Sequence, residues 1–154
     1  MTSVLTTLML LAGCASPQSS AKRDVEKQKA VAEALANRHI HINISQMHPA
    51  RYSSRTVSYG FYLELKGDML ESRLPYMGPV PQSAPISSEG LNFEAPIINY
   101  RETRPKKNMT RIELSARTKE DLYHYLIEIY DSGSAYIRVR GQNRDSISFD
   151  GDLE

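Results

Sequence analysis

The sequence predicts an all-β domain: an antiparallel meander that forms a small barrel or a curled sandwich, with one N-terminal α-helix. From residue 39 onward, short stretches alternate hydrophobic and polar residues, which is typical of half-buried strands. Turn residues separate these stretches at regular intervals. Only one stretch has helical spacing, so the crossover helices that a parallel sheet needs are missing from the pattern.

The N-terminus carries the pattern of a lipoprotein signal. An apolar run from Val4 to Ala12 leads to Gly13 and to Cys14, the single cysteine of the chain. The run is shorter than the roughly 20 residues of a membrane-spanning helix, and it fits the apolar region of a signal peptide, about 7–15 residues long. Ala12 and Gly13 are small because a peptidase must bind the backbone closely before the cut. We therefore expect residues 1–13 to be a signal peptide and Cys14 to be lipidated.

The alternative is a buried free cysteine in a cytosolic protein. The position of Cys14, the apolar run and the small residues before it favour the lipobox Leu11-Ala12-Gly13-Cys14. Residues 1–4 contain no lysine or arginine, although a signal peptide normally starts with a positive region. This leaves open whether the natural chain starts upstream of Met1.

Residues 14–20 are expected to form a lipidated, flexible tether, because they are small and polar. Residues 21–154 then form a single β-rich domain with its N-terminal helix. The formal net charge of the chain is +1, which gives no general attraction to nucleic acid. If lipid occupies Cys14, no disulfide is available.

The helix is expected over residues 21–37, with Ser20 as its N-cap and Asn37 as its C-terminal stop. Its apolar stripe is thin and rich in alanine, so the helix should lie on the domain rather than inside it. The stripe consists of Val25, Ala32, Leu35 and Ala36.

The first strands are predicted around two turns. Ile40, Ile42 and Ile44 point to one face of a strand that Pro49 ends. The next strand turns Tyr59, Phe61, Leu63 and Leu65 inward, and Gly67-Asp68 makes a hairpin to a partner strand over Met69–Leu74.

The second half predicts six further strands. Two short strands, Leu91–Glu94 and Ile97–Thr103, are broken at Pro96 and followed by a turn over residues 104–108. The stretch Leu122–Tyr130 is apolar on both faces and is placed centrally in the sheet. The remaining inward residues are Thr110, Ile112, Leu114 and Ala116, then Ala135, Ile137 and Val139, and finally Ile147 and Phe149.

Four segments together resemble a Bacteroidetes lipoprotein family of unknown function, the domain of unknown function 4251. They are Lys66–Gly78, Gly90–Phe93, Asp131–Ala135 and Asn143–Gly151. Where the family has an aromatic residue after Leu-Pro-Tyr, this chain has Met77. The resemblance runs from about the helix to the C-terminus and implies an envelope lipoprotein. It brings no reaction, ligand, cofactor or catalytic residue.

The resemblance also bears on the location. In lipoproteins of this kind an acidic run after the cysteine marks export to the outer face, and no such run follows Cys14. We therefore expect an outer-membrane lipoprotein of the bacterial cell envelope that faces the periplasm, with the membrane as a partner through its lipid anchor.

Catalytic and metal sites are not expected. His39 and His41 share one strand face and could bind zinc, but a third ligand such as His48 or His124 is not placed beside them by the sequence. No Gly-x-Ser-x-Gly elbow is present. We expect no metal, no cofactor and no enzymatic activity.

Two regions are candidates for binding. The long loop from Pro75 to Gly90, with Tyr76, Met77 and Phe93, either plugs one end of the sheet or forms a binding surface. Arg111, Arg138 and Arg140, together with Arg117, could share an outward face that holds a phosphate or another anionic envelope group. Interspersed glutamates also allow a merely solvated face.

The first hypothesis for function is a non-catalytic binding lipoprotein that holds a protein partner or a small amphipathic ligand at the barrel mouth. The second is a structural or interaction protein of the envelope without a pocket, and an enzyme ranks third. An open interior cavity would favour the first hypothesis, and an interior filled by side chains would favour the second.

Overall fold

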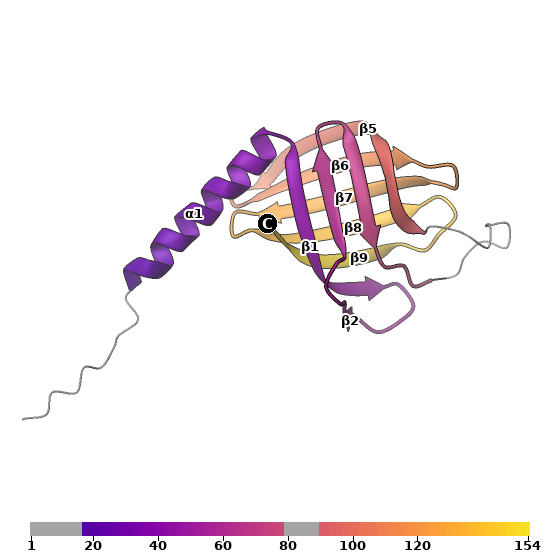
Figure 1. Ribbon diagram of the computed structural model, residues 1–154, viewed down its shortest axis with the longest axis horizontal. Helices are drawn as coiled ribbons and strands as arrows, with labels where there is room; N and C mark the ends of the chain where they lie inside the picture. The colour runs from indigo at the N-terminus through magenta and orange to yellow at the C-terminus, as the bar shows by residue number, and fades with distance from the viewer. Residues whose placement is uncertain (1–16, 79–89) are drawn as a thin grey trace, which may run out of the picture.

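The computed structural model describes residues 17–78 and 90–154, which form one helix and nine strands (Figure 1). The expected signal peptide, Cys14 and residues 79–89 of the expected loop lie outside the described residues. The elements are α1 (Pro17–Ala36), β1 (His39–Pro49), β2 (Arg55–Thr56), β3 (Tyr62–Lys66), β4 (Met69–Leu74), β5 (Leu91–Lys106), β6 (Met109–Arg117), β7 (Leu122–Tyr130), β8 (Ser134–Gly141) and β9 (Ile147–Leu153).

Eight of the strands form a closed, antiparallel barrel. From β3 to β9 each strand pairs with the next one along the chain, while β1 pairs with β3 on one side and with β9 on the other. The β1–β9 pairing closes the ring (Figure 1). The two-residue strand β2 pairs with the end of β1 and was not predicted from the sequence. The predicted all-β meander is confirmed, and of its two forms the barrel is correct.

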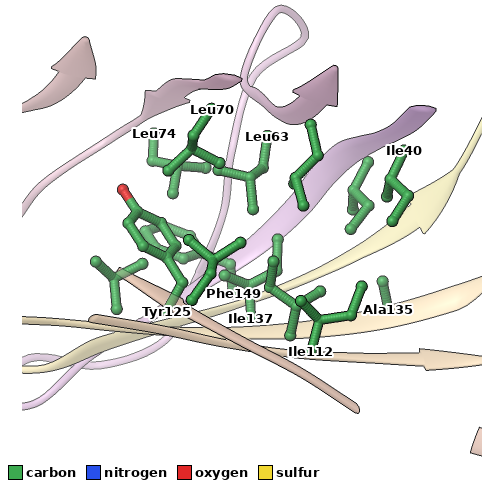
Figure 2. Packing of buried hydrophobic residues seen from close by; sticks show 14 of the residues in the cluster. Ile40, Leu63, Leu70, Leu74, Ile112, Tyr125, Ala135, Ile137 and Phe149 are labelled. Atoms are coloured by element: carbon green, nitrogen blue, oxygen red, sulfur yellow. The ribbon is translucent and has the colours of Figure 1, made fainter. Parts of the chain in front are cut away.

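The barrel interior is filled by side chains. Ile40, Leu63, Leu70, Ile137 and Phe149 are fully buried and point toward one another from opposite walls (Figure 2). Eight strands leave an interior just wide enough for side chains to fill. A ligand therefore has to bind at the outer surface or at an end of this barrel.

The predicted start of β3 and the predicted inward direction of Tyr59 are both wrong. The strand β3 begins at Tyr62, and the Tyr59 side chain is fully exposed. Gly60 has a φ of 103°, and such a residue interrupts the extended backbone that the alternating pattern requires. The hairpin at Gly67-Asp68 and the strand β4 are as predicted.

The predicted break at Pro96 is also wrong, because β5 runs through it as one strand of 16 residues. Its register with β4 ends at Pro96, and its register with β6 begins at Ile97. Proline lacks the N–H that a strand donates, and here it lies where one pairing gives way to the next. The following turn is tighter than predicted and contains only residues 107 and 108.

The strand β7 lies between β6 and β8, as predicted for a central strand. However, its burial alternates. Tyr123, Tyr125, Ile127 and Ile129 are buried, whereas Leu126 is partly exposed on the outside. A closed barrel has one inner face, so the apolar residues of both faces cannot all be buried.

The helix α1 projects away from the barrel, and its C-terminal part meets the barrel wall (Figure 1). Val31 is buried and Leu35 packs partly against the core, whereas Val25 is 64% exposed, which corrects its predicted place in the apolar stripe. The helix also begins at Pro17, before the predicted cap Ser20, and ends at Ala36. Proline is favoured at the first helical position. Residues 17–20 therefore belong to the helix and not to a flexible tether. Within residues 17–78 and 90–154, no helix is long and apolar enough to cross a membrane.

Candidate functional site

Most of the binding residues singled out by the sequence lie in two separate places, an aromatic end of the barrel and a basic groove on its outer face. The aromatic end consists of Tyr76, Phe93, Tyr123 and Arg144. Phe93 of β5 stacks on Tyr123 of β7, with ring centroids 5.0 Å apart. The Tyr123 hydroxyl donates a hydrogen bond to the Gly90 carbonyl at 3.0 Å. Burial raises the pKa of both Tyr76 and Tyr123, as expected for phenols removed from water.

Arg144 packs between Glu120 and Tyr76 at this end of the barrel. Its side chain is 4% exposed, its Nη2 lies 3.1 Å from Glu120 Oε2, and its guanidinium lies 5.4 Å from the centroid of the Tyr76 ring. The neighbouring Asp121 carboxylate accepts hydrogen bonds from the backbone N–H groups of Gln142 and Asn143 at 3.1 and 3.3 Å. These bonds hold the turn that carries Arg144.

Among the described residues, the aromatic end packs against the core, and Phe93 also lines a hollow beside it. Phe93 is buried, and Tyr76 and Met77 are partly buried against the core. Three of the segments that carry the family resemblance meet here, since Tyr76, Gly90 and Arg144 belong to different ones. Of the two alternatives for these residues, the geometry favours the plug.

The basic groove consists of Arg101, Glu113, His124, Leu126, Arg138 and Arg140. These residues line a hollow of about 560 Å³ on the outer face of β5 to β8, together with residues that include Tyr100. The register places Arg101, Glu113, Leu126 and Arg138 side by side on successive strands. His124 is opposite Arg140 in the next row. The volume lies within the usual range of small-molecule sites, roughly 300–1,000 Å³.

A β-bulge lies at one edge of this groove. The register of β5 against β6 shifts between Ile98 and Tyr100, and Asn99 has a φ of 59°. Asparagine adopts the left-handed region more readily than most residues, and bulges bend the strand that carries them. Asn99 itself lines the groove. This signal was present in the sequence, but a lone asparagine inside a strand does not identify a bulge.

The arginines of the groove lack the carboxylate partner that six other arginines have, as do Arg55 and Arg117 outside it among the described residues. Among the described residues, Arg101, Arg138 and Arg140 form no ion pair with a carboxylate, and Arg138 donates a hydrogen bond to the Tyr136 hydroxyl at 3.1 Å. Six arginines elsewhere each lie within 4 Å of an aspartate or glutamate. They are Arg38, Arg51, Arg73, Arg104, Arg111 and Arg144.

The sequence-predicted basic face is therefore divided. Arg138 and Arg140 line the groove, whereas Arg111 lies outside it and binds Glu128 through Nη2 at 2.6 Å. Arg117 lines a separate hollow with Phe93. Sequence reasoning missed Arg101, His124 and Leu126, because only the strand register brings them beside Arg138 and Arg140.

His124 is held in place within the groove. Its Nδ1 lies 2.8 Å from Ser115 Oγ on the neighbouring strand. This hydrogen bond occupies one ring nitrogen and leaves Nε2 for another partner.

His39 and His41 on β1 both lie close to the carboxylate of Glu64. Glu64 Oε1 lies 3.3 Å from His39 Nε2 and 3.7 Å from His41 Nδ1, and Lys66 Nζ lies 2.9 Å from the other oxygen of Glu64. Burial alone would raise the pKa of Glu64, but the hydrogen bonds from Lys66 and His39 outweigh it and lower that pKa. In the part of the chain that the structure describes, no group of three histidine, cysteine or acidic side chains is placed to bind a metal ion.

A serine, a histidine and an aspartate form a chain of hydrogen bonds near the end of β1. His48 Nδ1 lies 2.7 Å from Ser54 Oγ, and His48 Nε2 lies 2.8 Å from Asp150 Oδ2. Ser54 is exposed, and the hollow that Asp150 lines with Glu128 and Asp152 includes neither Ser54 nor His48. Acyl transfer needs hydrogen-bond donors placed around a developing oxyanion. The arrangement thus links β1, the following loop and β9 on an exposed surface.

The fold and these two places define a class: a closed eight-stranded antiparallel barrel with a filled interior, a projecting N-terminal helix and a basic groove on its wall. The family model described as a domain of unknown function (DUF4251) matches residues 22–153, and the chain belongs to this family. The resemblance seen in the sequence is thereby confirmed.

A solved structure has the same fold. The chain is similar to a DUF4251 family protein from Bacteroides eggerthii DSM 20697, with a TM-score of 0.67 and 12% sequence identity over 86% of this chain and 89% of that chain. No curated protein matches the sequence.

Proposed function

We propose that the protein is a cell-envelope lipoprotein whose barrel is a non-catalytic binding domain, and that its ligand binds in the basic groove. One observation carries the proposal: the interior is filled, while the outer wall has a ligand-sized hollow whose three arginines lack carboxylate partners among the described residues. At the barrel mouth, which the sequence suggested as the binding place, Phe93 stacks on Tyr123 and Arg144 lies over the Tyr76 ring.

The helix α1 supports the anchored arrangement. Two residues separate the expected lipid attachment at Cys14 from the start of α1 at Pro17. The helix has 20 residues, so it is about 30 Å long at 1.5 Å per residue. Residues 21–30 are all exposed, and a helix that is polar on all sides suits a spacer in water. A chain anchored at Cys14 in the outer membrane and facing the periplasm would hold its barrel away from the lipid.

The anchor is tested by detergent-phase partitioning of the wild type and of Cys14→Ala. We expect the wild type in the detergent phase and the variant in the aqueous phase or unprocessed. If the wild type stays in the aqueous phase, the lipoprotein assignment is wrong.

The binding domain is tested by amide hydrogen exchange of the full chain with and without an extract of envelope lipids and glycans. Exchange should slow in β6 to β8 and stay unchanged in β3 and β4, on another part of the wall. Protection confined to the aromatic end would instead place the ligand at the mouth.

The filled interior also favours a second candidate, a structural or interaction protein of the envelope without a pocket. For such a protein the extract of lipids and glycans should leave exchange unchanged everywhere. An envelope protein extract should then slow exchange over a broad part of the outer face.

A further inference from the structure

We propose that the basic groove binds an amphiphile with a phosphate headgroup: the phosphate lies between Arg138, Arg140 and His124, and the apolar part lies over Leu126. This inference rests on the proposed function and names the ligand class of the same groove.

The positive charge is concentrated on one side of the groove. Arg138 and Arg140 are two residues apart on the outer face of β8, so their Cα atoms are about 7 Å apart. His124 is the cross-strand neighbour of Arg140. Guanidinium groups match the geometry of phosphate oxygens and bind them with two parallel hydrogen bonds. Three donor groups therefore line the same side of the groove from two adjacent strands, with the Arg138 guanidinium next to the Tyr136 hydroxyl.

The acidic residue of the groove lies on the other side. Glu113 is the cross-strand neighbour of Arg101 and offsets its charge. Leu126 separates Glu113 from Arg138 in the same row. An anion consequently meets least repulsion at β7 and β8.

The apolar part of the ligand has its own contact. Leu126 is partly exposed and lies between two charged neighbours. A free phosphate would leave this side chain and most of the 560 Å³ hollow to water. A short hydrocarbon chain attached to the phosphate would cover both, since burying apolar surface stabilises a complex.

The experiment uses the full chain with Cys14→Ser, which carries no lipid, and calorimetric titration with octyl phosphate, inorganic phosphate and octyl glucoside. Octyl phosphate should bind at least tenfold more tightly than either of the other two. A charged hydrogen bond contributes enough for Arg138→Gln and Arg140→Gln each to weaken its binding by about tenfold or more. Leu126→Asn should weaken binding of octyl phosphate and leave inorganic phosphate unchanged.

The matched control is Arg55→Gln, which removes an exposed arginine from β2 outside the groove. It should leave all three affinities unchanged, and thermal melts should show every variant folded. Equal binding of phosphate and octyl phosphate would make free phosphate the ligand and overturn the amphiphile. Equal binding of octyl glucoside and octyl phosphate, or unchanged binding in both arginine variants, would overturn the phosphate site.

The experiments distinguish a failure of this ligand class from a failure of the proposed function. If the envelope extract slows exchange in β6 to β8 but octyl phosphate does not bind, the ligand class is wrong and the binding groove stands. If octyl phosphate binds as expected but wild type stays in the aqueous phase, the ligand class stands and the lipoprotein anchor is wrong.

Discussion

The aromatic end and the basic groove each contain arginine side chains, but these side chains differ in burial and in their carboxylate partners. At the aromatic end Arg144 is 4% exposed and held by Glu120 and the Tyr76 ring. In the groove Arg138 and Arg140 are exposed, and no carboxylate pairs with them within the described residues. The first arrangement closes the barrel, while the second leaves charge available on its wall.

The difference follows from solvation. A buried charge without a partner is strongly destabilising, so an arginine at a closed end requires its carboxylate. An exposed guanidinium is solvated by water and needs no protein partner, which leaves it free for a ligand. Burial together with a carboxylate partner therefore separates Arg144 from the exposed Arg138 and Arg140.

The largest expected effect tests the closed end. Replacing Arg144→Met removes a buried cation that lies 3.1 Å from Glu120 Oε2 and contacts the Tyr76 ring, and should lower the free energy of unfolding by about 3 kcal/mol. Chemical denaturation measures the loss. The control is Arg51→Met, which breaks the exposed pair of Arg51 with Asp145 and should cost less than about 1 kcal/mol. Equal losses would show that burial does not separate the two pairs.

The second effect concerns the ring under Arg144. Tyr76→Ala removes a partly buried ring and should cost about 2 kcal/mol, because apolar contacts are lost and a cavity remains. Tyr59→Ala is the control, since that side chain is fully exposed and its loss should stay within about 0.5 kcal/mol. If thermal melts give Tyr76→Ala the stability of wild type, the plug is not structural and the aromatic end becomes a candidate recognition surface.

The third effect concerns the bulge beside the groove. Asn99 has a φ of 59°, and a β-branched residue is strained there by about 1–2 kcal/mol. Asn99→Val should therefore be less stable than wild type, while Asn99→Gly should be close to it. Denaturation of both variants decides this, and a fully stable valine variant would contradict the bulge.

The fourth effect tests the open face. Arg140→Gln should change stability by less than about 0.5 kcal/mol, because an exposed side chain without an ion pair contributes little. A loss as large as that of Arg144→Met in the same denaturation assay would mean that Arg140 supports the barrel wall. The contrast between the two regions would then fail.

The smallest effect is expected at Ser54. Ser54 is exposed and does not line the hollow that Asp150 shares with Glu128, and acyl transfer needs preorganised donors around the reacting atoms, so Ser54 should not react with a fluorophosphonate probe above the level of Ser54→Ala. Mass spectrometry of the labelled chain measures this. Stoichiometric labelling that requires His48 would contradict the non-catalytic proposal.

Local patterns decided much of the fold. Alternation of Ile40, Ile42 and Ile44 predicted β1, and Gly67-Asp68 predicted the hairpin of β3 and β4. Two predictions failed at single residues. Gly60 shortens β3, and Pro96 does not interrupt β5 because the strand changes partners there. Such outcomes depend on neighbouring strands that a local window does not contain.

The candidate site was less predictable than the strands. The outward direction of Arg138 and Arg140 followed from the two-residue period of β8. Their grouping with Arg101, His124 and Leu126 required the register of four strands. Arg111 has the same outward direction but pairs with Glu128 and lies outside the groove.

The sequence by itself determined the antiparallel meander, the resemblance to the DUF4251 family and the inner and outer faces of most strands, because these properties repeat over a few neighbouring residues. The tertiary structure decided the closure of β1 on β9, the filling of the interior, the projection of α1 and the formation of the groove. Each of these depends on pairing or packing between segments that are far apart along the chain, and no local period specifies which segments meet.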